Sequence, residues 1–167
     1  APRPAPRLQL RNIQHMYGER YALRGVDFNL YPGEIHAVVG DHYSGKTTLA
    51  KVVAGDVQKQ HGVIEIEGRE IPFMTPQIAL RNRIAIVHQE MTLIPPLSVM
   101  ENVFAGRFPF FHLRPRKREE LLSTARRLFA ALGVEVDLEH PVRTLSREER
   151  QMTEVARALA VAPRIIV

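Results

Sequence analysis

One short run combines glycines, hydroxyl side chains and a lysine in the order that phosphate binding requires. Its nine residues are Gly40, Asp41, His42, Tyr43, Ser44, Gly45, Lys46, Thr47 and Thr48. Backbone N–H groups of a tight glycine loop point inward, and a helix that begins near Gly45 adds unpaired amides and the positive end of its dipole. The Lys46 ammonium can reach the β- and γ-phosphates of a nucleotide, and the Thr47 hydroxyl can coordinate Mg²⁺. The run therefore predicts a site for a triphosphate.

Tyr43 is the unusual residue of this loop. Its position often carries a small residue in phosphate-binding loops, and we expect the backbone cradle to survive the larger side chain. The alternative interpretation is an ordinary glycine-containing turn between a strand and a helix. The spacing of the two glycines and the sequence Gly-Lys-Thr favour the phosphate loop.

The elements on either side must hold this loop in place. The apolar run 35–39 predicts a strand that enters the loop, and residues 49–54 predict a helix that leaves it and is closed by Gly55. Alternation of apolar and polar residues predicts half-buried strands at 8–13, 25–30 and 63–68. We expect these strands to form a small antiparallel sheet beside the nucleotide.

The second half of the chain is predicted to be mostly helical. Before it, the apolar run 84–87 predicts a buried strand that presents Gln89 at its carboxyl end. Capping boxes and helical periodicity predict three helices, beginning at Ser98, covering 119–132 and running from Ser146 to about Val161. Residues 164–167 indicate the opening of another buried strand.

Composition limits the class of protein. With 167 residues and 45% hydrophobic content, the chain can bury one sizeable core, so one domain with subdomains is expected. The lack of cysteine excludes disulfides and cysteine-bound zinc. No apolar run reaches the roughly 18 residues that cross a bilayer. Residues 1–7 are expected to be a flexible N-terminal extension.

The net charge of +5 suits nucleic acid, an anionic membrane surface or phosphate ligands. The densest basic cluster, 114–118, has no interleaved aromatic residues and precedes a predicted helix. We interpret it as a solvated face and do not predict nucleic-acid binding from it.

Five features in a fixed order resemble the nucleotide-binding domain of an ATP-binding-cassette (ABC) transporter. They are Tyr17, the loop 40–48, Gln89 after a strand, the pair Leu145 and Ser146 at a helix start, and the strand 165–167. The resemblance covers residues 8–167. It implies an α/β, P-loop NTPase fold, here partial, with a small antiparallel β subdomain and a helical subdomain at about 98–162. Segments 86–90, 93–95 and 97–107 are similar to the first cassette of ribose, galactose and xylose importer ATPases.

The resemblance assigns a role to each matching residue. Tyr17 stacks on adenine, and the loop residues hold ATP with Mg²⁺. Gln89 approaches Mg²⁺ and the attacking water, and it is the catalytic candidate. Ser146 contacts the γ-phosphate held by a partner cassette. The alternatives are an exposed aromatic beside a turn for Tyr17 and a locally bonded amide at a strand end for Gln89.

The sequence departs from the family pattern in two places. Glu148 stands where the family's signature carries a glycine, which indicates a weakened signature; a well-capped helix with acidic residues near its positive end is the alternative. The family's strand matching 165–167 continues into a metal-supporting Asp and a catalytic Glu, which are not in this sequence. We therefore expect the cassette to be C-terminally incomplete and unable to hydrolyse ATP by itself.

The leading hypothesis is the ATP-binding subunit of an importer for a sugar, cytoplasmic and peripheral on the inner face of the cell membrane. Its implied partners are a second cassette, transmembrane permease subunits and, indirectly, a solute-binding protein. The alternatives are a regulatory cassette that binds nucleotide without hydrolysis, and an importer ATPase for a nucleoside or flavin-like solute. A nucleic-acid partner is suggested only by charge, and segments 86–90 and 97–107 argue against it.

Overall fold

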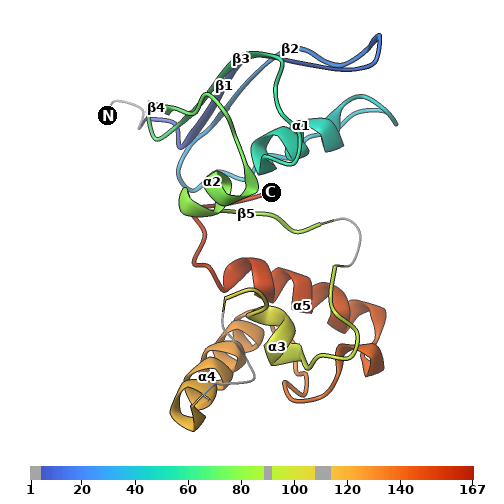
Figure 1. Cartoon of the computed structure of the whole chain (residues 1–167), viewed down its shortest axis with the longest axis vertical. Helices are drawn as coiled ribbons and strands as arrows, with labels where there is room; N and C mark the ends of the chain where they lie inside the picture. Colours follow the sequence, from blue (N-terminus) through green and yellow to red (C-terminus); the bar gives the residue numbers. More distant parts are fainter. Residues whose placement is uncertain (1–4, 89–91, 108–113) are drawn as a thin grey trace. The chain divides into compact units, whose positions relative to one another are not determined.

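The computed structural model describes residues 5–88, 92–107 and 114–167 of the chain (Figure 1). The chain divides into two compact units. The first unit comprises Ala1–Ile84 together with Val167, and the second comprises Ala85–Ile166. We describe each unit by itself.

The first unit is built on a four-stranded sheet with the order β2-β1-β3-β4. Its strands are β1 (Leu8–Tyr17), β2 (Arg20–Leu30), β3 (His61–Ile66) and β4 (Arg69–Glu70), and every neighbouring pair is antiparallel. Leu8 of β1 pairs with Leu30 on one side and Ile66 on the other. Leu8 and Leu10 are buried, as the alternating pattern requires, and Ile13 is buried because an irregularity between Leu10 and Ile13 shifts the register. The predicted antiparallel sheet is confirmed, with strands β1 and β2 longer than the alternation alone indicated.

Two helices complete the first unit. Helix α1 (Lys46–Ala54) buries Val52 and Val53, and α2 (Pro76–Arg81) is capped by Thr75. Gly55 ends α1 with φ 81°, and a Cβ at this glycine would overlap the backbone of Thr75. The predicted helix and its glycine stop are therefore confirmed, and the close approach to α2 explains why that stop is glycine.

The predicted strand at 35–39 is wrong for this structure. These residues have no strand conformation, and Ile35 and Val39 are 97% and 86% exposed. A strand needs a neighbour to take up its backbone hydrogen bonds. No strand in the described part of the chain pairs with this segment, so its apolar side chains have nothing to pack against.

The second unit is a group of helices around one apolar core. They are α3 (Val99–Val103), α4 (Pro115–Ala131), the 3₁₀ turn η2 (Val142–Thr144) and α5 (Arg147–Leu159) (Figure 1). The core includes Val99, Val103, Phe104, Leu121 and Phe129. Among the described residues, no helix is long and apolar enough to cross a membrane.

Sequence signals place most of these helix ends correctly. Ser98 and Ser146 cap α3 and α5, and each forms the predicted capping box with the glutamate three residues later. Helix α4 begins earlier than the predicted 119, because Pro115 is well suited to a first helical turn. The basic cluster 114–118 therefore forms the start of α4 and does not precede it.

Two short strands form a separate sheet. They are β5 (Ile84–Ala85) and β6 (Ile165–Ile166), and they pair with each other. The strands expected at 84–87 and 164–167 are confirmed in place and shortened to two residues each.

Candidate functional site

The phosphate-loop sequence ends at a helix start that only glycine fits. Gly45 is the N-cap of α1, with φ 97° and ψ 0°. A Cβ at this position would overlap the backbone carbonyl oxygen of Ala22 on β2. The requirement for glycine thus has two causes, a left-handed backbone and close packing of the helix start against the sheet.

The N-terminus of α1 is open to an anion. The first amides of any α-helix have no acceptor within the helix, and no described side chain caps those of α1. Its first turn holds no acidic residue. Unpaired donors and the positive end of the dipole therefore act together at this point.

Lys46 adds a full positive charge at the same place. Its Nζ donates to the carbonyl oxygens of Gly40 and Asp41, at 2.7 and 2.6 Å, and to Ser44 Oγ at 3.2 Å. The ammonium is thus held inside the loop by weak neutral acceptors. Phosphate oxygens are charged acceptors and make stronger hydrogen bonds to a lysine, so they can replace these partners.

The two threonines after Lys46 differ in access. Thr47 is exposed, whereas Thr48 is buried at 8% exposure. Only the Thr47 hydroxyl is therefore placed to reach a bound ion. Among the described residues no group of three or more His, Cys, Asp or Glu side chains forms a metal site. The exposed Thr47 hydroxyl is a hard oxygen donor of the kind that Mg²⁺ binds.

Tyr43 stands at the exposed corner of the loop. Its backbone is left-handed, with φ 64°, and its side chain is 81% exposed. The ring meets His42 edge-on at 5.0 Å between centroids, and the guanidinium carbon of Arg20 lies 5.8 Å from the ring centroid. A small residue is common at such a corner because glycine adopts this conformation without steric cost.

Tyr17 is the last residue of β1 and is 52% exposed. Its ring meets His15 edge-on at 4.6 Å between centroids, and His15 Nδ1 lies 2.9 Å from the backbone carbonyl oxygen of Gln58. That distance assigns the His15 proton to Nδ1, since a carbonyl only accepts. Tyr17 is thus supported at one edge and half exposed, as a ring that stacks on a base must be.

Gln89, the predicted catalytic and metal-binding residue, lies outside the described residues. Three residues further on, Thr92 is bonded to helix α5. The Glu154 carboxylate accepts hydrogen bonds from the Thr92 N–H at 2.6 Å and from its hydroxyl at 3.0 Å. Glu154 is 3% exposed and forms an ion pair of 2.8 Å with Arg157.

Sequence reasoning missed Glu154, although a signal was present. A glutamate on the apolar face of a predicted helix must find donors, and Arg157 one turn later is a suitable partner. The hydrogen-bonded residues Thr92, Glu154 and Arg157 are joined by Arg107, whose guanidinium donates to the Arg157 backbone carbonyl oxygen at 3.0 Å. Burial, and then the positive charge of Arg157, lower the pKa of Arg107.

Ser146 occupies a closed helix start in the second unit. Its Oγ accepts from the Glu149 N–H at 3.2 Å, and its own N–H donates to Glu149 Oε2 at 2.7 Å. Hydrogen bonds to the Glu149 carboxylate, from the Ser146 backbone N–H first and then from the Ser146 side chain, lower the pKa of that carboxyl. Glu148 beside them is exposed. Ser146 belongs to the second unit, whereas the loop 40–48 belongs to the first.

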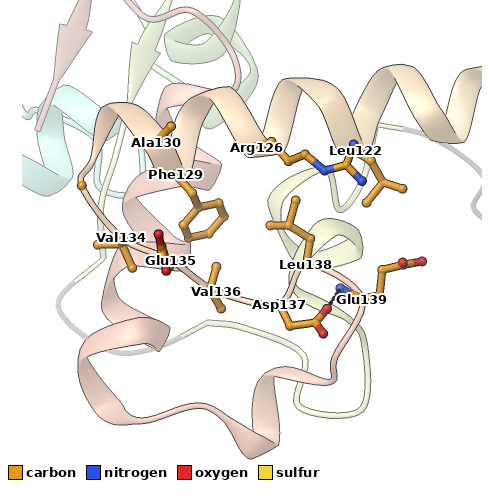
Figure 2. A pocket seen from close by; sticks show the side chains of 11 residues that line it. Leu122, Arg126, Phe129, Ala130, Val134, Glu135, Val136, Asp137, Leu138 and Glu139 are labelled. Atoms are coloured by element: carbon orange, nitrogen blue, oxygen red, sulfur yellow. Dashed lines mark hydrogen bonds between the residues drawn. The ribbon is translucent and has the colours of Figure 1, made fainter.

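The second unit also contains a cavity of about 650 Å³ between α4 and residues 133–139 (Figure 2). Leu122 and Phe129 of α4 form part of its apolar lining, and Val136 and Leu138 from the following segment form another part. Asp137 accepts from the Glu139 N–H at 2.9 Å at its edge. None of the predicted site residues lines this cavity.

Comparison with solved structures identifies the fold. The ADP conformation of MJ1267, an ATP-binding cassette of an ABC transporter, matches 98% of this chain and 68% of its own length with TM-score 0.82 and 25% identity. The dimeric structure of MJ0796, a bacterial ABC transporter cassette, matches 95% of this chain and 72% of its own with TM-score 0.78 and 28% identity. The chain thus has the P-loop NTPase fold of these cassettes.

Comparison with curated proteins gives the same family. Ribose import ATP-binding protein RbsA 2 of Escherichia coli O157:H7 is 43% identical over 162 residues, which are 97% of this chain and 32% of that protein. RbsA of Geobacillus kaustophilus is 36% identical over 96% of this chain and 33% of its own length. This chain spans about a third of the length of these relatives. Because the profile of the family described as ABC transporter also matches residues 23–167, the chain belongs to the ABC transporter family.

Proposed function

We propose that this chain is the ATP-binding cassette of an importer ATPase that couples ATP binding and hydrolysis to the uptake of a sugar. The observation that carries the proposal is the open N-terminus of α1 with Lys46 inside the loop. The proposed partners are a second cassette, transmembrane permease subunits and, indirectly, a solute-binding protein. The cassette would then lie on the cytoplasmic face of the membrane.

Each proposed site residue has a different part of the nucleotide to bind or act on. Lys46 exchanges its loop carbonyls for the β- and γ-phosphates, and the amides at the start of α1 bind the same anion. Thr47 would hold Mg²⁺, which when bound would supply positive charge beside the phosphates. Tyr17 stacks on the base. Gln89 is proposed to orient the attacking water.

A regulatory cassette without turnover is the second candidate. The closed, acidic start of α5 favours it, because Glu148 and Glu149 oppose a second phosphate chain at Ser146. The sugar assignment rests on the relatives, whose names specify ribose import. A nucleoside or flavin-like solute is the other possibility for the transported molecule.

Titration calorimetry with ATP and ADP tests the site. We expect Lys46→Ala to weaken binding ten- to a hundredfold, since a hydrogen bond to a charged group contributes about 1.5–3 kcal/mol. Lys51→Ala is the matched control, because Lys51 lies on the same helix in its last turn. Equal affinity of the Lys46 variant and the parent would show that the loop is not the site. Phosphate release and sugar uptake by the assembled transporter in vesicles then separate the importer from the regulatory cassette.

A further inference from the structure

Tyr43 has a backbone conformation that disfavours its own side chain. With φ 64° it lies in the left-handed region, where an L-residue other than glycine meets steric repulsion. At 81% exposure, Tyr43 has little core packing to compensate. Residues in such conformations persist when surrounding contacts hold them, and they gather at ligand sites.

Arg20 supplies such a contact. Its guanidinium carbon lies 5.8 Å from the centroid of the Tyr43 ring, within cation–π range. Arg20 is the first residue of β2 and pairs directly with Tyr17, the last residue of β1. The hairpin that carries Tyr17 therefore also contacts Tyr43 in the loop, through Arg20.

We propose that Arg20 is a positioning residue for the triphosphate site, acting through Tyr43. Its guanidinium keeps the Tyr43 ring in place, and the ring keeps residue 43 in the left-handed conformation that shapes the loop for phosphate. The inference rests on the proposed function. Because glycine adopts this conformation unaided, a loop with glycine at position 43 does not need Arg20.

The test measures dissociation constants for ATP and for inorganic tripolyphosphate on the same variants. Arg20→Ala is expected to weaken both ligands about two- to fivefold, the effect of losing an exposed cation–π contact. Arg20→Lys keeps a cation over the ring and is expected to retain most of the affinity. Tyr17→Ala is expected to weaken ATP and leave tripolyphosphate unchanged, because it removes a base contact only.

Arg24→Ala is the matched control. Arg24 lies on the same strand, and its guanidinium carbon is 5.8 Å from the ring of Tyr21. This variant loses the same charge and the same kind of contact without touching the loop. It therefore calibrates the general loss of positive charge near a triphosphate.

The decisive comparison is Arg20→Ala in a Tyr43→Gly background. In that background we expect Arg20→Ala to lower the affinity for either ligand no more than the Arg24→Ala control does. A loss as large as in the parent background would mean that Arg20 meets the nucleotide directly, and it would overturn the proposal. An effect on ATP without one on tripolyphosphate, or an Arg20 effect equal to that of Arg24, would overturn it as well. Lys46→Ala tests the phosphate site separately from the role of Arg20. If Lys46→Ala weakens binding and Arg20→Ala does not, the loop is the site and only the proposal for Arg20 is wrong.

Discussion

Helices α1 and α5 begin with the same unpaired backbone amides, but these amides are left uncapped by any described side chain at α1 and are capped by side chains at α5. Each begins with amides that have no acceptor within the helix and with the positive end of a dipole. At α1 the N-cap is Gly45, no described side chain satisfies the amides, and Lys46 adds positive charge. At α5 the N-cap is Ser146, Glu149 completes a capping box, and two glutamates occupy the first turn.

The difference indicates that the residues at a helix start decide whether its first amides are left available to an anion. The α1 start is free to accept an external anion, because no described side chain caps its first amides. At α5, the Ser146 oxygen already accepts from the Glu149 N–H, and the Ser146 side chain is also hydrogen-bonded to the Glu149 carboxyl, so Glu149 occupies the groups that could meet a phosphate. An anion arriving there must also overcome the charge of Glu148 and Glu149.

The largest expected effect comes from a substitution at the uncapped start of α1. Gly45→Ala forces a Cβ into a left-handed backbone and against the Ala22 carbonyl, and we expect a loss of about 2–4 kcal/mol in the free energy of unfolding and at least tenfold in ATP affinity. Urea unfolding and calorimetry measure these quantities. Gly68→Ala is the control, since φ is 76° there with open space around the Cβ, and about 1–2 kcal/mol is expected without any change in ATP affinity. Equal behaviour of the two variants would show that the close packing at Gly45 is unimportant.

The next largest effect is expected from removing a negative charge at the start of α5. If the α5 start meets a phosphate held by a partner cassette, Glu148→Gln should favour ATP-driven association of cassettes by about 1–2 kcal/mol after screening. Affinity of the single chain for ATP should stay the same. Light scattering with and without ATP measures association, and Glu135→Gln removes an equal charge elsewhere in the second unit. An unchanged association constant would leave Glu148 as a helix-end carboxylate only.

Ser146→Ala separates capping from ligand binding. Removal of the cap should lower the free energy of unfolding by about 1 kcal/mol while ATP binding by the single chain stays at the parental value. Ser98→Ala, which removes the other capping box, is expected to behave alike. A drop in ATP affinity confined to the Ser146 variant would place this serine in the nucleotide site of its own chain.

The smallest effect is a pH dependence at α5. The Glu149 pKa is lowered from its ordinary 4.5 by hydrogen bonds from Ser146, so the ionised form is favoured in the folded chain. Its stabilising contribution is complete above the unfolded pKa and is lost as the pH falls through the lower folded pKa. A carboxyl-carbon NMR titration should give a midpoint below 4.5. A midpoint at or above that value would contradict the capping bonds.

Features that depend on a few neighbouring residues could be predicted from the sequence. The Ser-x-x-Glu boxes at Ser98 and Ser146, the glycine stop at Gly55 and the alternation in the β1–β2 hairpin all follow from local geometry. The glycine spacing and the lysine of the loop 40–48 are local features of the same kind, and the proposed phosphate site is based on them. Its order relative to Tyr17 and Ser146 was enough to indicate the family.

Other features were decided by residues that are distant in the sequence. The apolar run 35–39 satisfies a strand pattern, yet a strand exists only where another strand accepts its hydrogen bonds. The burial of Glu154 depends on Thr92, 62 positions away. The contact of Arg20 with Tyr43 likewise depends on how the hairpin and the loop approach each other. The sequence by itself determined the glycine spacing and the lysine from which we propose a phosphate site. Tertiary packing decided which groups of that loop remain free of protein partners, because those contacts come from residues distant in the sequence.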